Sequence, residues 1–129
     1  MSVLNIDEPG PDGLYGLHQL KIAGNYKSSS NGKDIDLISL DVEVLPDSRL
    51  RFYLINLRPP IDEAGKPLVA SKVGANSTIE IFEHTRGSQD LEYIKTVSSD
   101  LVFAPNNLVA DGNGGFFVTN DRDVKVPKV

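Results

Sequence analysis

The chain of 129 residues contains no cysteine, which excludes disulfide bonds, a thiol nucleophile and a cysteine metal site. Residues 1–13 have neither a basic start nor an apolar core, so we expect no signal peptide in this chain and take the cytoplasm as the default location. There is no run of about 18 apolar residues, so we expect no membrane span.

Positive charge is also scarce. The net charge is -5 and the isoelectric point is near 4.9, and Lys and Arg do not cluster. Such a surface repels phosphate backbones, so nucleic acid is not an expected partner. The sequence has no Gly-x-Ser-x-Gly motif, and a covalent serine mechanism therefore has no support.

No segment shows helical apolar spacing over about three turns, so we predict an all-β fold. The clearest alternation lies in residues 35–45, where apolar and polar side chains fall on opposite sides and predict a strand that buries its apolar side. The apolar side carries Ile38, Leu40, Val42 and Val44, and the polar side carries Ser39, Asp41 and Glu43. Residues 50–56 should return as the second strand of a hairpin.

The rest of the chain also predicts strands and connections. We expect residues 1–13, which are rich in Pro, Gly and Asp, to be an irregular lead-in, and residues 58–76 to be a long excursion. Further strands are predicted at 14–22, 78–83, 91–97, 101–104, 108–110 and 116–119.

Side-chain oxygens gather at the ends of the last predicted hairpin. Asn106 and Asn107 precede its first strand, and Asp121 follows its second strand. Amide and carboxylate oxygens at strand ends suit a calcium ion. The same residue types are ordinary in turns, because they accept positive φ and bond their own backbone, so both interpretations stay open.

Several segments in order resemble the serum paraoxonase and arylesterase family, in particular its fungal members. They are residues 56–60, 73–82, 94–97, 105–109 and 116–121, within a match from about Leu14 to Asp121. The resemblance implies a six-bladed β-propeller with calcium in its central tunnel, which hydrolyses aryl esters and lactones. A propeller blade takes about 40 to 50 residues, so residues 14–129 would be a partial propeller of about two to three blades.

The resemblance also implies roles for single residues. Asn106 stands where the family places an amide ligand of the catalytic calcium, and Asp121 stands at the active-site end of a strand. Asn107 replaces an aspartate that usually binds a second, structural calcium, and the loss of that charge weakens the second site. Leu57 stands where the family has a proton-transfer histidine, and a leucine cannot exchange a proton.

The two histidines do not fill this gap. We expect His84 to be a solvated residue of a hairpin turn, and His18 to be a packing residue of a strand rather than a general base. The general base is therefore unidentified.

Alternative functions stay open beside the hydrolase. One is a propeller-derived binding or structural module without catalysis, and a weaker one is another six-bladed calcium propeller of the gluconolactonase or strictosidine synthase type. The expected ligand is a small ester or lactone. A partial ring also leaves strand edges unpaired, so we expect self-association through these edges.

Overall fold

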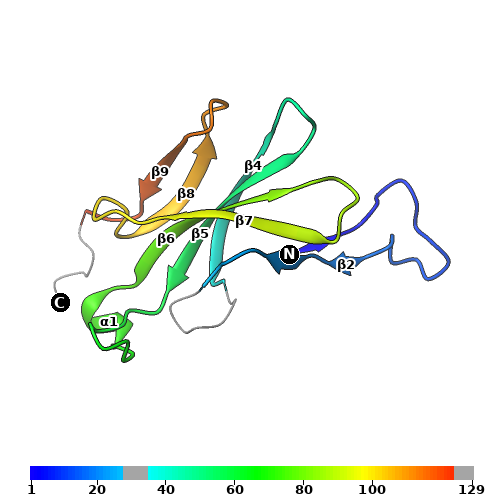
Figure 1. Cartoon of the computed structure of the whole chain (residues 1–129). Coiled ribbons are helices and arrows are strands. Elements are labelled where there is room, and N and C mark those ends of the chain that lie inside the picture. The colour runs from blue at the N-terminus through cyan, green and yellow to red at the C-terminus, as the bar shows by residue number, and fades with distance from the viewer. Residues whose placement is uncertain (28–34, 124–129) are drawn as a thin grey trace.

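The computed structural model describes residues 1–27 and 35–123 and consists mainly of β-strands, which confirms the all-β prediction (Figure 1). A five-stranded sheet has the order β3-β7-β6-β5-β4. Its strands are β3 (Lys21–Ala23), β4 (Leu37–Val44), β5 (Leu50–Arg58), β6 (Asn76–His84) and β7 (Asp90–Val97). The strands from β4 to β7 form an antiparallel meander, and β3 pairs with β7 in parallel. The hairpins predicted at 35–56 and 78–97 are therefore confirmed.

The sheet is covered on both faces. The side chains of Leu20 and Tyr26, which flank β3, pack on one side, which we call the N-terminal face. A separate hairpin of β8 (Pro105–Ala110) and β9 (Phe116–Asn120) lies against the other side, which we call the hairpin face. The cluster on the N-terminal face contains Leu20, Tyr26, Phe52, Leu54, Phe82 and Leu91. The cluster on the hairpin face contains Tyr53, Ile55, Ile79, Ile81, Val102 and Leu108. β5 and β6 therefore carry core residues on both sides.

The edge strand β4 departs from the predicted orientation. Its apolar residues Leu40, Val42 and Val44 are 43%, 38% and 62% exposed, whereas the polar residues between them are half-buried. The prediction that β4 buries its apolar side is therefore wrong. The polar side faces β8, where Asp41 Oδ2 accepts a hydrogen bond of 2.7 Å from the backbone N–H of Ala110. These polar contacts, and not an apolar core, fix the orientation of β4.

The predicted strand at 14–22 is divided in two. β2 (His18–Gln19) and β3 are separate, and β2 pairs with β1 (Ser2–Val3), which lies inside the segment predicted as an irregular lead-in. Tyr15 and Gly16 have φ of 55° and 62°, a left-handed conformation that an extended strand cannot contain. The excursion at 59–75 holds one short helix, α1 (Ala70–Val73).

The approach to β8 also differs from the prediction. Residues 101–104 form a bend instead of a strand, and the residues predicted as a polar corner, Pro105 to Asn107, begin β8. The side chain of Asn120 maintains this bend, because its Oδ1 accepts hydrogen bonds from the backbone N–H groups of Phe103 (3.2 Å) and Ala104 (3.0 Å). The N–H groups of Phe103 and Ala104 therefore bond a side chain and not a neighbouring strand.

Candidate functional site

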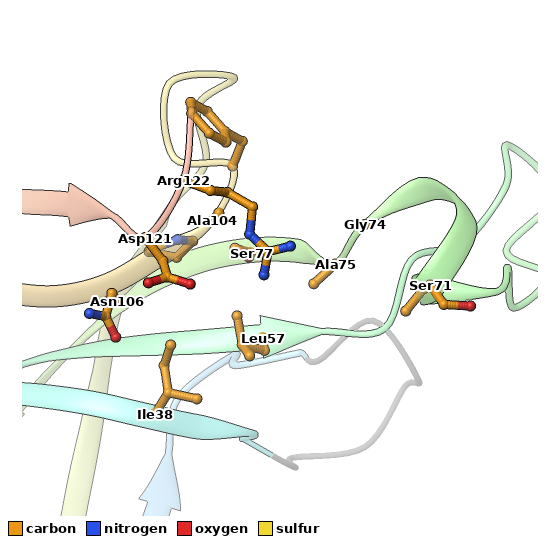
Figure 2. A pocket seen from close by; sticks show the side chains of 13 residues that line it. Ile38, Leu57, Ser71, Gly74, Ala75, Ser77, Ala104, Asn106, Asp121 and Arg122 are labelled. Carbon is orange, nitrogen blue, oxygen red and sulfur yellow. The ribbon is translucent and has the colours of Figure 1, made fainter. Parts of the chain in front are cut away.

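A cavity of about 390 Å³ opens on the hairpin face, where β5 ends and β6 begins (Figure 2). Its walls come from β4, β5, α1 and the loop after it, β6, the 101–104 bend, β8 and the end of β9. The lining residues used below are Ile38, Leu57, Ser77, Asn106, Asp121 and Arg122. The volume is in the range of small-molecule sites.

The cavity brings together two of the three site residues predicted from the sequence. Asn106, near the start of β8, and Asp121, just after β9, both lie at the open end of the hairpin, and Figure 2 shows their side chains near each other. The strand register shifts between Pro105 and Asn107, which makes Asn106 a bulge residue. A bulge turns a side chain away from the regular alternation of a strand. The N–H of Asp121 donates to the carbonyl of Ala104 at 2.7 Å, which closes this open end of the hairpin.

Asn107 does not belong to this cavity. Its Oδ1 accepts a hydrogen bond of 2.7 Å from the Ser39 hydroxyl on β4 and another of 3.0 Å from the N–H of Leu108. The amide oxygen of Asn107 therefore helps to attach the β8–β9 hairpin to the sheet. The structure separates the two adjacent asparagines that the sequence groups as metal ligands.

Leu57 and Ser77 form part of the cavity wall on the adjacent strands β5 and β6. They are directly opposite each other in the antiparallel register, so their side chains lie on the same face of the sheet. Ser77 is only 5% exposed, and within residues 1–27 and 35–123 its Oγ has no hydrogen-bond partner. From the sequence, Ser77 is expected to begin a strand within the 73–82 segment of the resemblance, and no role at the site is predicted for it.

The histidines lie elsewhere. His84 is 6% exposed at the far end of β6, opposite Leu50, and its Nδ1–H donates to the carbonyl of Asp90 at 2.9 Å. The prediction of a solvated turn histidine is wrong, because β6 continues to this residue and the ring bonds the start of β7. His18 is half-buried on β2 and donates from Nδ1 to the carbonyl of Gly16. Neither residue lines the cavity of Asn106 and Asp121.

The cavity offers few groups for a metal ion. Asn106 can supply an amide oxygen and Asp121 a carboxylate, whereas calcium takes about 6–8 oxygen ligands. In the part of the chain that the structure describes, no group of three or more His, Cys, Asp and Glu is placed to hold a metal. Asn106 and Asp121 can therefore supply some of the oxygen ligands of a calcium ion but not the full shell.

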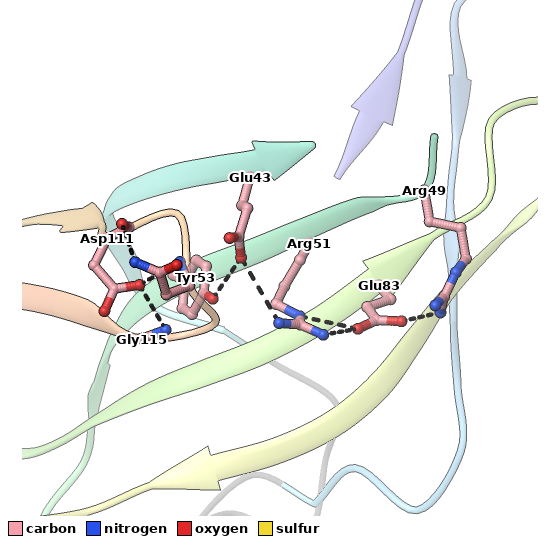
Figure 3. A network of polar contacts seen from close by, with 8 residues as sticks. Glu43, Arg49, Arg51, Tyr53, Glu83, Asp111 and Gly115 are labelled. Atoms are coloured by element: carbon pink, nitrogen blue, oxygen red, sulfur yellow. Dashed lines mark hydrogen bonds and ion pairs between the residues drawn. The ribbon is translucent and has the colours of Figure 1, made fainter. Parts of the chain in front are cut away.

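A charged network lies elsewhere, near the turn that joins β4 to β5 (Figure 3). Arg51 bonds Glu83 through Nε and Nη2 at 2.9 and 2.7 Å, and Arg49 bonds the other oxygen of the same carboxylate. Tyr53 donates to Glu43 at 2.9 Å. Burial, followed by this bond to a carboxylate, raises the pKa of Tyr53 above its ordinary value. These groups bond one another, and we interpret the network as structural.

A second network surrounds Glu80, which is fully buried on β6. Its Oε1 accepts hydrogen bonds from Arg58, from Asn56 and from Thr78, at 3.0, 3.1 and 2.7 Å. Thr96 donates to the other oxygen. Because every partner is a neighbouring strand residue and none lines the cavity, this network also stabilises the sheet.

Comparisons with models of protein families and with curated proteins found no match. Among the described residues, there is no helix with the length and apolar character needed to cross a bilayer.

Proposed function

We propose that the chain is part of a calcium-dependent hydrolase of aryl esters or lactones with a β-propeller architecture. The observation that carries the proposal is that Asn106 and Asp121, both implied as site residues by the family resemblance, line one cavity of suitable size. Two features of the fold support it. The meander from β4 to β7 has the four-stranded form of a propeller blade, and the β8–β9 hairpin packs on its face as the start of a second blade would.

In this proposal the cavity residues have the following roles. Asn106 would hold calcium through its amide oxygen, and further oxygens would come from blades outside these 129 residues. The bound ion would polarise the ester carbonyl. Asp121 is the carboxylate that could accept a proton in the cavity, and Leu57 and Ile38 provide an apolar wall for the aryl or acyl group.

A binding module without catalysis is the second candidate, and Leu57 favours it. Leu57 lines the cavity where the resemblance implies a proton-transfer histidine, and Asp121 and Arg122 are the charged side chains along the described wall. A half-apolar cavity of this kind can bind an ester without hydrolysing it.

Phenyl acetate and calcium separate the two candidates when they are assayed on the complete protein, because the 129-residue chain supplies only part of the calcium shell and is expected to be inactive alone. Turnover that requires calcium and falls at least about tenfold in Asn106→Ala would support the hydrolase, since loss of an amide oxygen removes calcium affinity. Asn107→Ala is the matched control, because that amide bonds Ser39 outside the cavity and should leave turnover nearly unchanged. Binding of phenyl acetate without turnover, at any calcium concentration, would support the binding module and refute the hydrolase.

Calcium affinity is a separate test of the incomplete site. With one carboxylate and one amide in the cavity, the 129-residue chain should bind calcium more weakly than about micromolar, because few charges offset the dehydration of the ion. Calorimetry measures this directly. A sub-micromolar dissociation constant would contradict the assignment of a shared site.

A further inference from the structure

The buried hydroxyl of Ser77 makes no hydrogen bond that would stabilise the described part of the fold. In the described residues its Oγ has no hydrogen-bond partner, although the side chain is almost fully buried. Buried hydroxyls nearly always have a partner, because desolvation otherwise goes uncompensated. Leu57, directly across the sheet, is apolar and cannot provide one.

The cavity places this hydroxyl beside the two predicted site residues. Ser77 and Asp121 line the same cavity, as does Leu57 on the strand adjacent to Ser77 (Figure 2). Asp121 offers an acceptor, whereas the donors available to a ligand are the Ser77 hydroxyl, the Asn106 amide and the Arg122 guanidinium. Arg122 is exposed and Ser77 is buried, so the serine is the donor that solvent satisfies least.

We propose that the Ser77 hydroxyl donates a hydrogen bond to the carbonyl oxygen of the small ester or lactone held in this cavity. The ligand class rests on the proposed function. An acceptor with an apolar body matches the surroundings, since Leu57 and Ile38 are apolar and the Ser77 hydroxyl is a buried donor in the same cavity. Ser77 is thus a substrate-positioning residue that the sequence resemblance does not identify.

A second, smaller cavity of about 70 Å³ offers a competing explanation. Ser77 also lines that space, together with Ser98, Ser99 and Asp100. A water bound there to several polar groups would satisfy the hydroxyl without any ligand. The two explanations differ in what Ser77→Ala changes, because only the first couples the hydroxyl to the carbonyl of a ligand.

The test uses δ-valerolactone labelled with ¹³C at its carbonyl, added to the full chain with excess calcium. In the parent protein the carbonyl stretch of the bound lactone should lie at lower frequency than in Ser77→Ala, and the affinity should fall about five- to tenfold in the variant. Ser71→Ala is the matched control, because Ser71 lines the same cavity but is exposed. It should change neither the band nor the affinity.

Thermal unfolding of both variants separates positioning from folding. Ser77→Ala should unfold at the same temperature as the parent or higher, since it removes a buried hydroxyl without a partner. An unchanged carbonyl band would overturn the proposal. A Ser77→Ala protein that loses stability but keeps its lactone affinity would also overturn it, because that is the result expected if a bound water satisfies the hydroxyl.

Lactone binding and ester hydrolysis are separate readouts, so the role of Ser77 and the proposed hydrolase can be refuted independently. Bound lactone with a shifted band would support the role of Ser77 whether or not this chain, which holds only part of the calcium site, hydrolyses it. Calcium-dependent turnover that Ser77→Ala leaves unchanged would support the hydrolase and overturn the role of Ser77. If the parent binds no lactone, the role of Ser77 is overturned, and phenyl acetate turnover alone then decides the function.

Discussion

Replacement of Arg58 by methionine should destabilise the protein more than any other change to a surface-reaching charge. Glu80 is fully buried, and Arg58 is the cation that pairs with it, with Nη2 at 2.8 Å from Oε1. Arg58→Met leaves the carboxylate buried without its counter-charge, while the long apolar side chain preserves much of the packing against Tyr26. Breaking a buried ion pair by removal of one partner costs about 3–5 kcal/mol.

Arg49→Met is the matched control. Arg49 also pairs with a buried carboxylate, that of Glu83, but its own side chain is 40% exposed. Arg51 still bonds Glu83 at 2.7 Å after Arg49 is removed, so no charge becomes isolated. The cost should be about 1 kcal/mol or less, as for exposed ion pairs.

Urea unfolding of the parent and the two variants measures these free energies. A loss of about 3–5 kcal/mol is a large part of the stability of a domain, which is about 5–15 kcal/mol, so the midpoint for Arg58→Met should fall steeply. Combination with Glu80→Gln completes a double-mutant cycle, in which the two changes should fall short of additivity by about 2 kcal/mol. If Arg58→Met costs no more than Arg49→Met, the argument from burial is refuted.

Three further predictions concern the β8–β9 turn, Tyr53 and the exposed side of β4. Gly115→Ala should destabilise the hairpin, because the new Cβ would lie 2.6 Å from Oδ2 of Asp111. The other oxygen of that carboxylate bonds the N–H of Gly115, so the clash would also disturb this hydrogen bond. Hydrogen exchange should show a loss of amide protection in β8–β9 alone. Tyr53 should ionise above its ordinary pKa of about 10, and since the folded state holds this proton more tightly, the stability it contributes is complete below about pH 10 and is lost as the pH rises through the folded pKa. Tyr53→Phe should reduce the late phase of a tyrosinate absorbance titration without removing it, because burial also raises the pKa of Tyr26. The parent chain should self-associate with rising concentration in light scattering, and Leu40→Glu or Val42→Glu should reduce this, because both residues lie on the exposed apolar side; a monodisperse parent would contradict the prediction.

The hairpins could be predicted from the sequence because their signals are local. The alternation in β4 and β5 and the polar turns after β6 and within β8–β9 specify neighbouring strands without reference to the rest of the fold. The side that β4 buries could not be predicted, because it depends on where the distant β8–β9 hairpin packs. Asp41 reaches the backbone of Ala110, a contact between residues far apart in the sequence.

The candidate site, like the fold, could be predicted from the sequence only in part. Asn106 and Asp121 could be predicted as site residues from their motifs; the structure places both at one cavity, and their roles stay a prediction. Ser77 could not be identified, because a serine at the start of a strand is ordinary and its interest comes from burial without a partner. His84 was misjudged because the position where β6 ends decides whether the ring is solvated, and strand boundaries are weakly encoded in local sequence.

The parallel pairing of β3 with β7 has a consequence for folding. Lys21 pairs with Asp90, so the N-terminal strand waits for about 70 further residues, which at ~5–20 residues per second is roughly 4–14 seconds of synthesis. During that time the meander from β4 to β6 can assemble through short hairpin closures, whereas β3 must await the last strand of the sheet. Leu20 and Tyr26, which flank β3, also pack on the N-terminal face, so this face stays open until β7 emerges, and a chaperone that binds apolar strands would find its target in that interval.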